Sequence, residues 1–482
     1  MIHNPKSLLP VVIFDETDSW DSVRQCCSDY LDQPGQRRLE AALSANTKGV
    51  AVEHHYIDKD YRDTFSNFHS KRFSTPVSRC VRLHFFNRAV SPDELKETAS
   101  IQGNYLGYSV IRPTRPNSIG RTLIDFKNYT GLGVYVCSCR EKVSLQGTEL
   151  EVEGFPFISQ DGDATVCAQS ALWMTARYYS NRYSLYPETY PFQLTQLSKD
   201  YSIGRLYPST GLTMWQLGES LRQLGFSPLA YSRSTYKGDF DRLLYTYIES
   251  GIPVIAGVPG HVIAIFGHTS DLSLCSRVTG AVFSSEFCTA WAVNDDNTSP
   301  CEILLKGGGG QSKFKFASID SFIAPLAEKV FLSAENFEQV VVKVLDNSRI
   351  GVKALSPELD KGSLVLRMYL TTVRSYKKQL ALRGMGNALV QKTYRELPLP
   401  HFIWVCELST PVEYAQGKIL GEIIWDATRN VWETEGWIAI HYPETLLIDV
   451  GSALNGSQEI INFDLTTESQ AYPMYRSNLK EV

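Results

Sequence analysis

The chain has 482 residues, of which 43% are hydrophobic and 21% are charged, and its formal net charge is -5 with a pI near 6.0. This length supports about two to four domains, and the composition excludes a disordered or low-complexity protein. The small negative charge gives no overall attraction to nucleic acid or anionic membranes, and no stretch approaches the ~20 consecutive apolar residues of a membrane helix. We therefore expect a soluble globular protein.

The ten cysteines are too sparse and too irregularly spaced for a disulfide framework. Such usage is typical of a reducing compartment, so we expect a cytoplasmic protein. Cys137 and Cys139 form a close pair, but one residue separates them and no second pair follows at the spacing of a zinc finger. We expect neither a metal site nor a cofactor.

Residues 1–144 alternate between strand and helix patterns and predict a mixed α/β region. Ser91 before Pro92 is a typical helix start, because serine caps and proline suits the first turn. The expected strands are 10–14, 49–57 and 77–86, and the expected helices are 19–31 and 61–73.

Three arginines, Arg112, Arg115 and Arg121, lie close together around a turn with two prolines and a glycine. They indicate either a site for a phosphate or carboxylate, or a solvated hairpin tip. A nucleic-acid or nucleotide binder is the weaker function that such a loop would serve.

In residues 145–335, three predicted helices precede a series of predicted strands, and this order is typical of an α+β fold. Residues 336–482 form a second mixed α/β region in which we find no catalytic constellation. The run Gly307 to Gly310 lacks the Gly-Lys-Ser/Thr ending of a phosphate loop, so we expect a turn there. The expected elements of the middle segment are helices 166–179, 209–225 and 240–250 and strands 252–258, 261–268, 290–295 and 314–318.

Cys167 opens the helix predicted over 166–179. The unpaired amides and the dipole at the start of a helix stabilise a thiolate, so Cys167 is a candidate nucleophile. Gln160 precedes it by seven residues, ahead of a turn that contains glycine. Its amide, with the backbone amide of Cys167, is a candidate donor to an oxyanion.

His261 begins an apolar strand after a Pro-Gly turn and is the candidate general base. His268 is its rival at the far end of the same strand, and only one of the two can face Cys167. A third group should orient the imidazole, and Asp295 at the end of the next strand is the candidate. Asn294 remains an alternative, because neighbouring strand residues point to opposite faces and the sequence does not fix the register.

The order Gln160, Cys167, "LRQLGF", "GIPVI", His261 and Asp295 resembles that of the papain-like cysteine peptidases, and especially the branch that processes bacteriocin leader peptides at double-glycine sites. The resemblance covers about residues 150–335. It implies a papain-like core with a Cys-His-Asp triad and an oxyanion-binding glutamine. Two departures stand out: Cys-Ala-Gln replaces the common Cys-Gly-Pro, and the residues between the His and Asp strands suggest an added hairpin.

The resemblance implies a cysteine peptidase or isopeptidase domain over 145–335, flanked by mixed α/β regions 1–144 and 336–482. Its substrate would be a peptide or protein, with no nucleic acid or membrane favoured, and the terminal regions would be free to bind a protein partner. Deamidation or transamidation would use the same thioester. An inactive scaffold that binds a protein is the alternative from another class.

Overall fold

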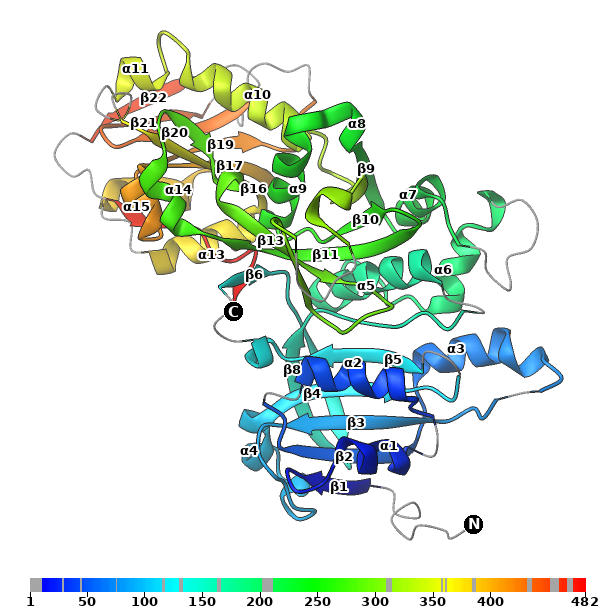
Figure 1. Cartoon of the computed structure of the whole chain (residues 1–482). Coiled ribbons are helices and arrows are strands. Elements are labelled where there is room, and N and C mark those ends of the chain that lie inside the picture. The colour runs from blue at the N-terminus through cyan, green and yellow to red at the C-terminus, as the bar shows by residue number, and fades with distance from the viewer. Residues whose placement is uncertain are drawn as a thin grey trace.

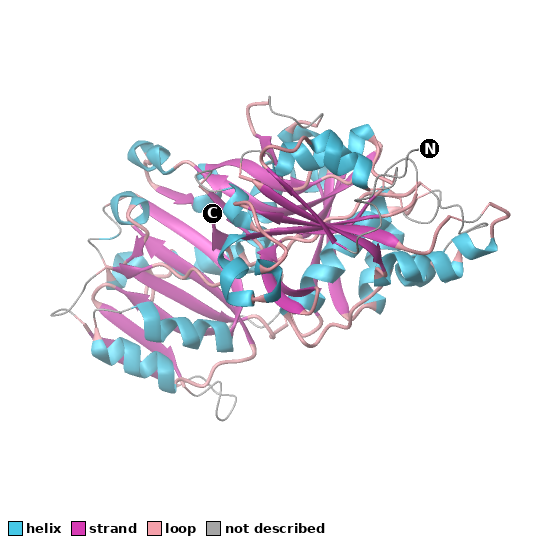
Figure 2. Ribbon diagram, turned by 90° about the horizontal axis from the view of Figure 1, so that it is seen from below, coloured by secondary structure: helices cyan, strands magenta, loops and turns pink. Residues whose placement is uncertain are grey.

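The computed structural model describes residues 11–27, 30–43, 46–74, 76–114, 118–129, 133–162, 166–201, 211–308, 314–356, 359, 362–383, 387–430, 436–450, 459–465 and 471–482. It is an α+β structure in which three antiparallel-rich sheets follow one another along the molecule (Figure 1). The N-terminal sheet lies at one end, the sheet of the middle segment lies at the centre, and the C-terminal sheet lies beyond it. Helices cover the sheets from both sides (Figure 2).

The N-terminal sheet has five antiparallel strands in the order β1-β2-β3-β4-β5. A hairpin, β7 and β8, packs on it and adds Val143, Leu145, Leu150 and Val152 to a core around Tyr105 and Tyr108. The strands are β1 Val11–Asp15, β2 Gly49–Tyr56, β3 Cys80–Phe86, β4 Tyr105–Ile111, β5 Ile119–Ile124, β7 Cys139–Leu145 and β8 Thr148–Gly154, and the main helices are α1 Trp20–Cys26, α2 Gln33–Leu43 and α3 Lys59–Asn67.

The middle sheet is buried on both faces because its strands alternate between two cores. In β11, Ala264 and Phe266 pack in the core that contains α5, whereas Ile263 and Ile265 pack in the core that contains α9. Its main path is β14-β13-β11-β10-β15-β9. These elements are β9 Phe226–Ser232, β10 Val254–Val258, β11 His261–Ser270, β13 Cys288–Asn294, β14 Glu302–Leu305, β15 Ser321–Ala327, α5 Cys167–Arg182, α6 Pro191–Leu197, α7 Met214–Gln223 and α9 Phe240–Glu249.

The C-terminal sheet has the order β12-β16-β17-β19-β20-β21-β22. Its helices pack on the hydrophobic faces of these strands. The elements are β12 Ala281–Phe283, β16 Leu364–Thr372, β17 Phe402–Ser409, β19 Gly421–Asp426, β20 Trp437–Tyr442, β21 Thr445–Asp449, β22 Ile460–Asp464, α10 Ala334–Leu345, α13 Val373–Arg383, α14 Ala388–Glu396 and α15 Pro411–Ala415.

Strands cross the boundaries expected at residues 144 and 335. The first boundary falls within the β7–β8 hairpin. β12, from the middle segment, pairs in parallel with β16 of the C-terminal sheet. Conversely, β24 Lys480–Glu481, from the C-terminal region, pairs with β6 Val134–Val136 on the middle sheet. The three regions are therefore joined by shared sheets as well as by the chain.

A buried ionic network also joins the middle and C-terminal regions. Arg367 on β16 donates from Nε to Glu249 of α9 at 2.6 Å and from Nη1 to Glu407 of β17 at 2.6 Å. Glu249 also contacts His268 at 2.5 Å, and Arg383 donates to Glu407 at 2.7 Å. All five side chains are buried away from water, so each charge is stabilised mainly by the opposite charges in the network.

Three expectations are wrong in detail. The segment 314–318 is not a strand but contains a short 3-10 helix, Phe316–Ser318, and the strand follows as β15. The insertion between the His and Asp strands is not a hairpin, because β12 joins the C-terminal sheet. The helix expected from Ser91 is reduced to short turns, because Glu97 adopts an extended backbone between Glu94–Lys96 and Thr98–Ile101.

No helix in the described part of the chain is both long enough and apolar enough to cross a bilayer. All ten cysteines are free thiols.

Candidate active site

Cys167 is the first residue of α5, as the sequence predicts. The preceding Val166 has no side-chain acceptor, so no side chain from the N-cap position satisfies the amides of the first turn. Residues Ala168 to Tyr179 are all buried, and they fix the helix against the sheet. Cys167 itself is partly exposed, whereas eight of the other nine cysteines are buried. The thiol therefore sits at the positive end of a rigid helix, within reach of solvent.

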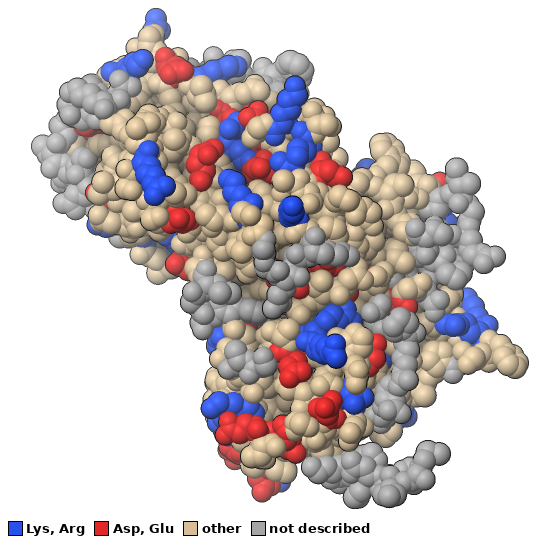
Figure 3. Space-filling model, viewed as in Figure 1, with Lys and Arg blue, Asp and Glu red and all other residues tan. Residues whose placement is uncertain are grey.

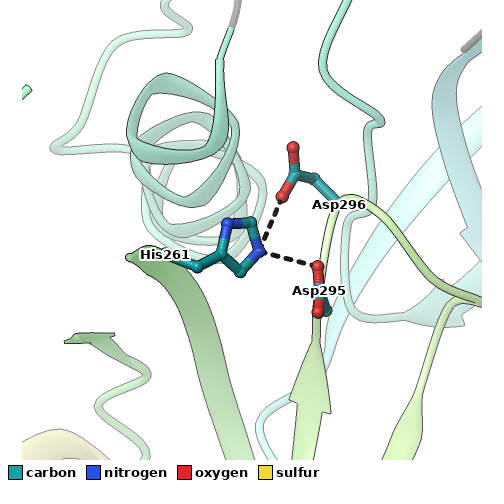
Figure 4. Close-up of side chains that lie close together, drawn as sticks. All are labelled: His261, Asp295 and Asp296. Atoms are coloured by element: carbon teal, nitrogen blue, oxygen red, sulfur yellow. Dashed lines mark hydrogen bonds and ion pairs between the residues drawn. The ribbon is translucent and has the colours of Figure 1, made fainter. Parts of the chain in front are cut away.

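His261 is the first residue of β11, and Gly260 before it has a φ of +69°, which allows the tight turn from β10. The antiparallel pair Val258 and His261 closes that turn. The Nε2 atom of the ring lies 2.8 Å from Oδ1 of Asp295. In Figure 4 the other ring nitrogen, Nδ1, points away from the carboxylates.

Asp295, and not Asn294, contacts His261. The side chain of Asn294 donates to the carbonyl of Pro156 at 2.9 Å and accepts from the amide of Cys301 at 2.8 Å, so it is turned to the opposite side. This is the alternation expected of neighbouring residues at a strand end.

Asp296 is the site residue that the sequence analysis missed. Its Oδ1 lies 3.3 Å from the same His261 nitrogen, and its side chain is buried (Figure 4). The run Asp295, Asp296, Asn297 was visible in the sequence, but only the turn after β13 brings both carboxylates to one side. Asn297 completes that turn by donating from its backbone amide to Oδ1 of Asp295 at 2.9 Å.

The environment of His261 favours the imidazolium. Burial lowers the pKa of the ring, but hydrogen bonds to its partners outweigh burial and raise the pKa from 6.5 to about 11. These partners are Asp295, Asp296 and the thiol of Cys167. The ring is therefore protonated at neutral pH. Burial also raises the pKa of the Asp296 carboxyl, and the contact with His261 offsets only part of this effect.

Phe314 covers one face of the imidazole, with ring centroids 5.7 Å apart and planes 15° apart. An apolar ring in this position limits the access of water to the His261–Asp295 contact and strengthens it.

Gln160 reaches the same turn from the other side. Its Nε2 donates to Oδ1 of Asn297 at 2.7 Å, and its backbone amide favours the ionised form of the nearby Asp296 carboxyl, which lowers the pKa of that group in part. Asn297 in turn places Nδ2 3.3 Å from Nε2 of His261. The structure thus brings Gln160, His261 and Asp295 together, and the Cys167 thiol is near enough to His261 to help raise the pKa of the ring.

The remaining candidates lie elsewhere or are already engaged. His268 is buried at the far end of β11 in the contact with Glu249. Arg121 forms ion pairs with Asp58, Asp60 and Glu141, and Arg112 donates to the carbonyls of Ile119 and Ser159. Both arginines are buried, so they form neither a solvated tip nor an open anion site. Arg115 and residues 309–313 lie outside the described residues.

On the face of the molecule in Figure 3, basic and acidic side chains are interspersed, so charge of one sign does not dominate it. Among the described residues, one group has the spacing of a metal site, and it consists of His261, Asp295 and Asp296. Nitrogen and carboxylate donors of this kind suit zinc.

A scan of protein-family models and searches of curated proteins and solved structures found no match to this chain.

Proposed function

We propose that the protein is a cysteine peptidase or isopeptidase with a papain-like core formed by α5 and the middle sheet. Cys167 is the nucleophile, His261 the acid and base, Asp295 the group that orients His261, and Gln160 with the Cys167 amide the oxyanion donors. The observation that carries the proposal is the double engagement of His261. Asp295 holds its Nε2 at 2.8 Å, and a partly exposed thiol at a helix start lies close enough to the ring to contribute to its raised pKa.

The proposed reaction proceeds through a thioester. The Cys167 thiolate adds to the carbonyl carbon, and the oxyanion accepts hydrogen bonds from the amides at the start of α5 and from Gln160. The His261 imidazolium gives its proton to the leaving amine as the C–N bond breaks. Neutral His261 then takes a proton from water as the hydroxide adds to the thioester. The carboxylic acid leaves as the C–S bond breaks, which restores the Cys167 thiolate beside the His261 imidazolium.

The raised pKa of His261 supports a resting state in which the Cys167 thiolate forms an ion pair with the His261 imidazolium. A histidine that is already protonated cannot act as the first base, but an imidazolium beside a thiol stabilises the thiolate. In such a pair, Asp295 keeps the ring oriented through every proton transfer.

The test is labelling by a fluorescent iodoacetamide at neutral pH, followed by digestion and mass spectrometry. We expect Cys167 to react preferentially, and Cys167→Ala to abolish both the fast labelling and any hydrolysis. The matched control is Cys301→Ala, since Cys301 is the other partly exposed cysteine and burial raises the pKa of its thiol to about 12. Equal reactivity of Cys167 and Cys301 would contradict the proposal and favour a scaffold without activity.

A further inference from the structure

The turn that orients His261 is held by a residue from the N-terminal region. Arg38, on α2, donates from Nη1 to the backbone carbonyl of Asp296 at 3.2 Å across 258 positions of the chain. The guanidinium is partly buried there, and burial lowers its pKa, while nearby carboxylates raise it. Its charged neighbours are Asp32, Asp296, Arg112 and Asp295.

The segment that carries Gln160 is also built on the N-terminal sheet. Phe157 and Thr122 of β5 exchange two backbone hydrogen bonds of 2.9 Å, which extend the sheet by one short bridge. Ser159 then donates to Ile119 at 3.0 Å, and its carbonyl accepts from Arg112 at 2.9 Å. The residue that precedes Gln160 is therefore fixed from two directions by the N-terminal region.

The two loops at the site are thus anchored outside the proposed core. The Asp turn contacts α2, and the Gln160 segment pairs with β5, while Gln160 and Asn297 link the two loops directly. From this arrangement we propose that Arg38 is a positioning residue for the Asp295–Asn297 turn, through which the N-terminal region completes the active site. The inference rests on the proposed function.

Arg38 favours the thiolate form of Cys167 in two ways. Its bond to the Asp296 carbonyl holds both carboxylates against the imidazole, and its charge offsets part of their negative charge. Without it, the turn loosens, the imidazolium is held less firmly beside Cys167, and the local potential becomes more negative. Both changes disfavour a thiolate, so alkylation of Cys167 should need a higher pH.

The experiment compares Arg38→Ala and Arg38→Lys with Arg37→Ala in the full chain. Arg37 is the neighbouring arginine on α2 and is exposed, so it is a matched control for charge and helix propensity. The measurements are the pH profile of Cys167 alkylation by iodoacetamide, quantified by mass spectrometry, and the melting temperature. A bond to a single carbonyl oxygen can be made by an ammonium, so lysine should restore most of the function.

For Arg38→Ala we expect the alkylation profile to move to higher pH by about one unit, with a rate at neutral pH about tenfold lower. Arg37→Ala should match the wild type, and Arg38→Lys should recover most of the rate. A wild-type profile for Arg38→Ala would overturn the inference, as would a loss that tracks only the melting temperature and is not rescued by lysine. Slow, unselective alkylation of Cys167 in the wild type would instead overturn the proposed function.

Discussion

Asp295 and Asp296 approach the same atom, Nε2 of His261, at 2.8 Å and 3.3 Å. One carboxylate is enough to orient an imidazole, and the second adds a buried charge next to it. The two aspartates should therefore differ in what they do for catalysis and for stability.

Replacing Asp295 should cost activity more than replacing Asp296. We expect Asp295→Ala to lower kcat by about tenfold to a hundredfold, a part of the ~10²–10⁴ that positioned proton transfer contributes. Asp296→Asn should have a smaller effect on kcat and should raise the melting temperature, because burial raises the pKa of that carboxyl and its charge is costly. Steady-state kinetics and thermal melts of both variants check this. A larger kcat loss for Asp296→Asn would reverse the two roles.

Gln160 should matter for acyl transfer and not for the reactivity of the thiol. A donor to the oxyanion acts only when a tetrahedral intermediate forms, and alkylation by iodoacetamide forms none. We expect Gln160→Ala to lower kcat by about a hundredfold or more, in the range measured for single oxyanion donors, while the alkylation rate of Cys167 stays near the wild-type value. Parallel losses in both rates would show that Gln160 only supports the Asn297 turn.

The contribution of His261 to stability should fall as the pH rises. A base whose pKa is raised from 6.5 to about 11 in the folded state adds stability that is complete below 6.5 and is lost as the pH rises through about 11. The difference in unfolding free energy between the wild type and His261→Gln should therefore be largest near neutral pH and shrink on the alkaline side. Denaturant unfolding between about pH 6 and about pH 10 measures this difference. A difference that grows with pH would contradict the ion pair.

Arg367 should be essential to the stability of the junction between the middle and C-terminal sheets. Its removal leaves Glu249 and Glu407 buried with less compensation, and breaking a buried pair costs roughly 3–5 kcal/mol. Arg367→Ala should lower the unfolding free energy by about this amount, whereas Arg374→Ala, at an exposed position on α13, should change it by less than about 0.5 kcal/mol. Similar melting temperatures for the two variants would argue against the network.

Local patterns in the sequence were enough to predict much of the site. The apolar run after Cys167 predicted a buried helix over 166–179 with Cys167 at its amino end, and α5 spans Cys167–Arg182. Strand periodicity placed His261 at the start of one strand and Asp295 at the end of the strand expected over 290–295, whereas β13 ends one residue earlier, at Asn294. Antiparallel pairing of neighbouring strands then made the approach of His261 and Asp295 predictable. The choice between Asp295 and Asn294 was not predictable, because it depends on the register of the strands, which only the folded sheet fixes.

Contacts between distant parts of the chain could not be predicted in the same way. Nothing near Arg38 in the sequence indicates a carbonyl 258 positions away, since a half-exposed helix arginine is compatible with many partners. The parallel pairing of β12 with β16 was missed for a related reason. The residues between the His and Asp strands suggested a hairpin, and nothing in the short run Ala281–Phe283 indicates that it pairs with the edge of a second sheet. Backbone pairing of this kind is set by the tertiary fold and leaves little trace in local composition.

The pairing of β6 with β24 has a consequence for how the chain is made. Tyr135 and Glu481, which meet across these strands, are 346 positions apart. At a synthesis rate of ~5–20 residues per second, β6 leaves the ribosome roughly 17 to 70 seconds before its partner. Throughout that interval one edge of β6 has no strand to pair with, and unpaired edges attract other chains. The short edge of β6 that β24 covers is therefore open in every nascent chain until translation reaches Lys480 and Glu481.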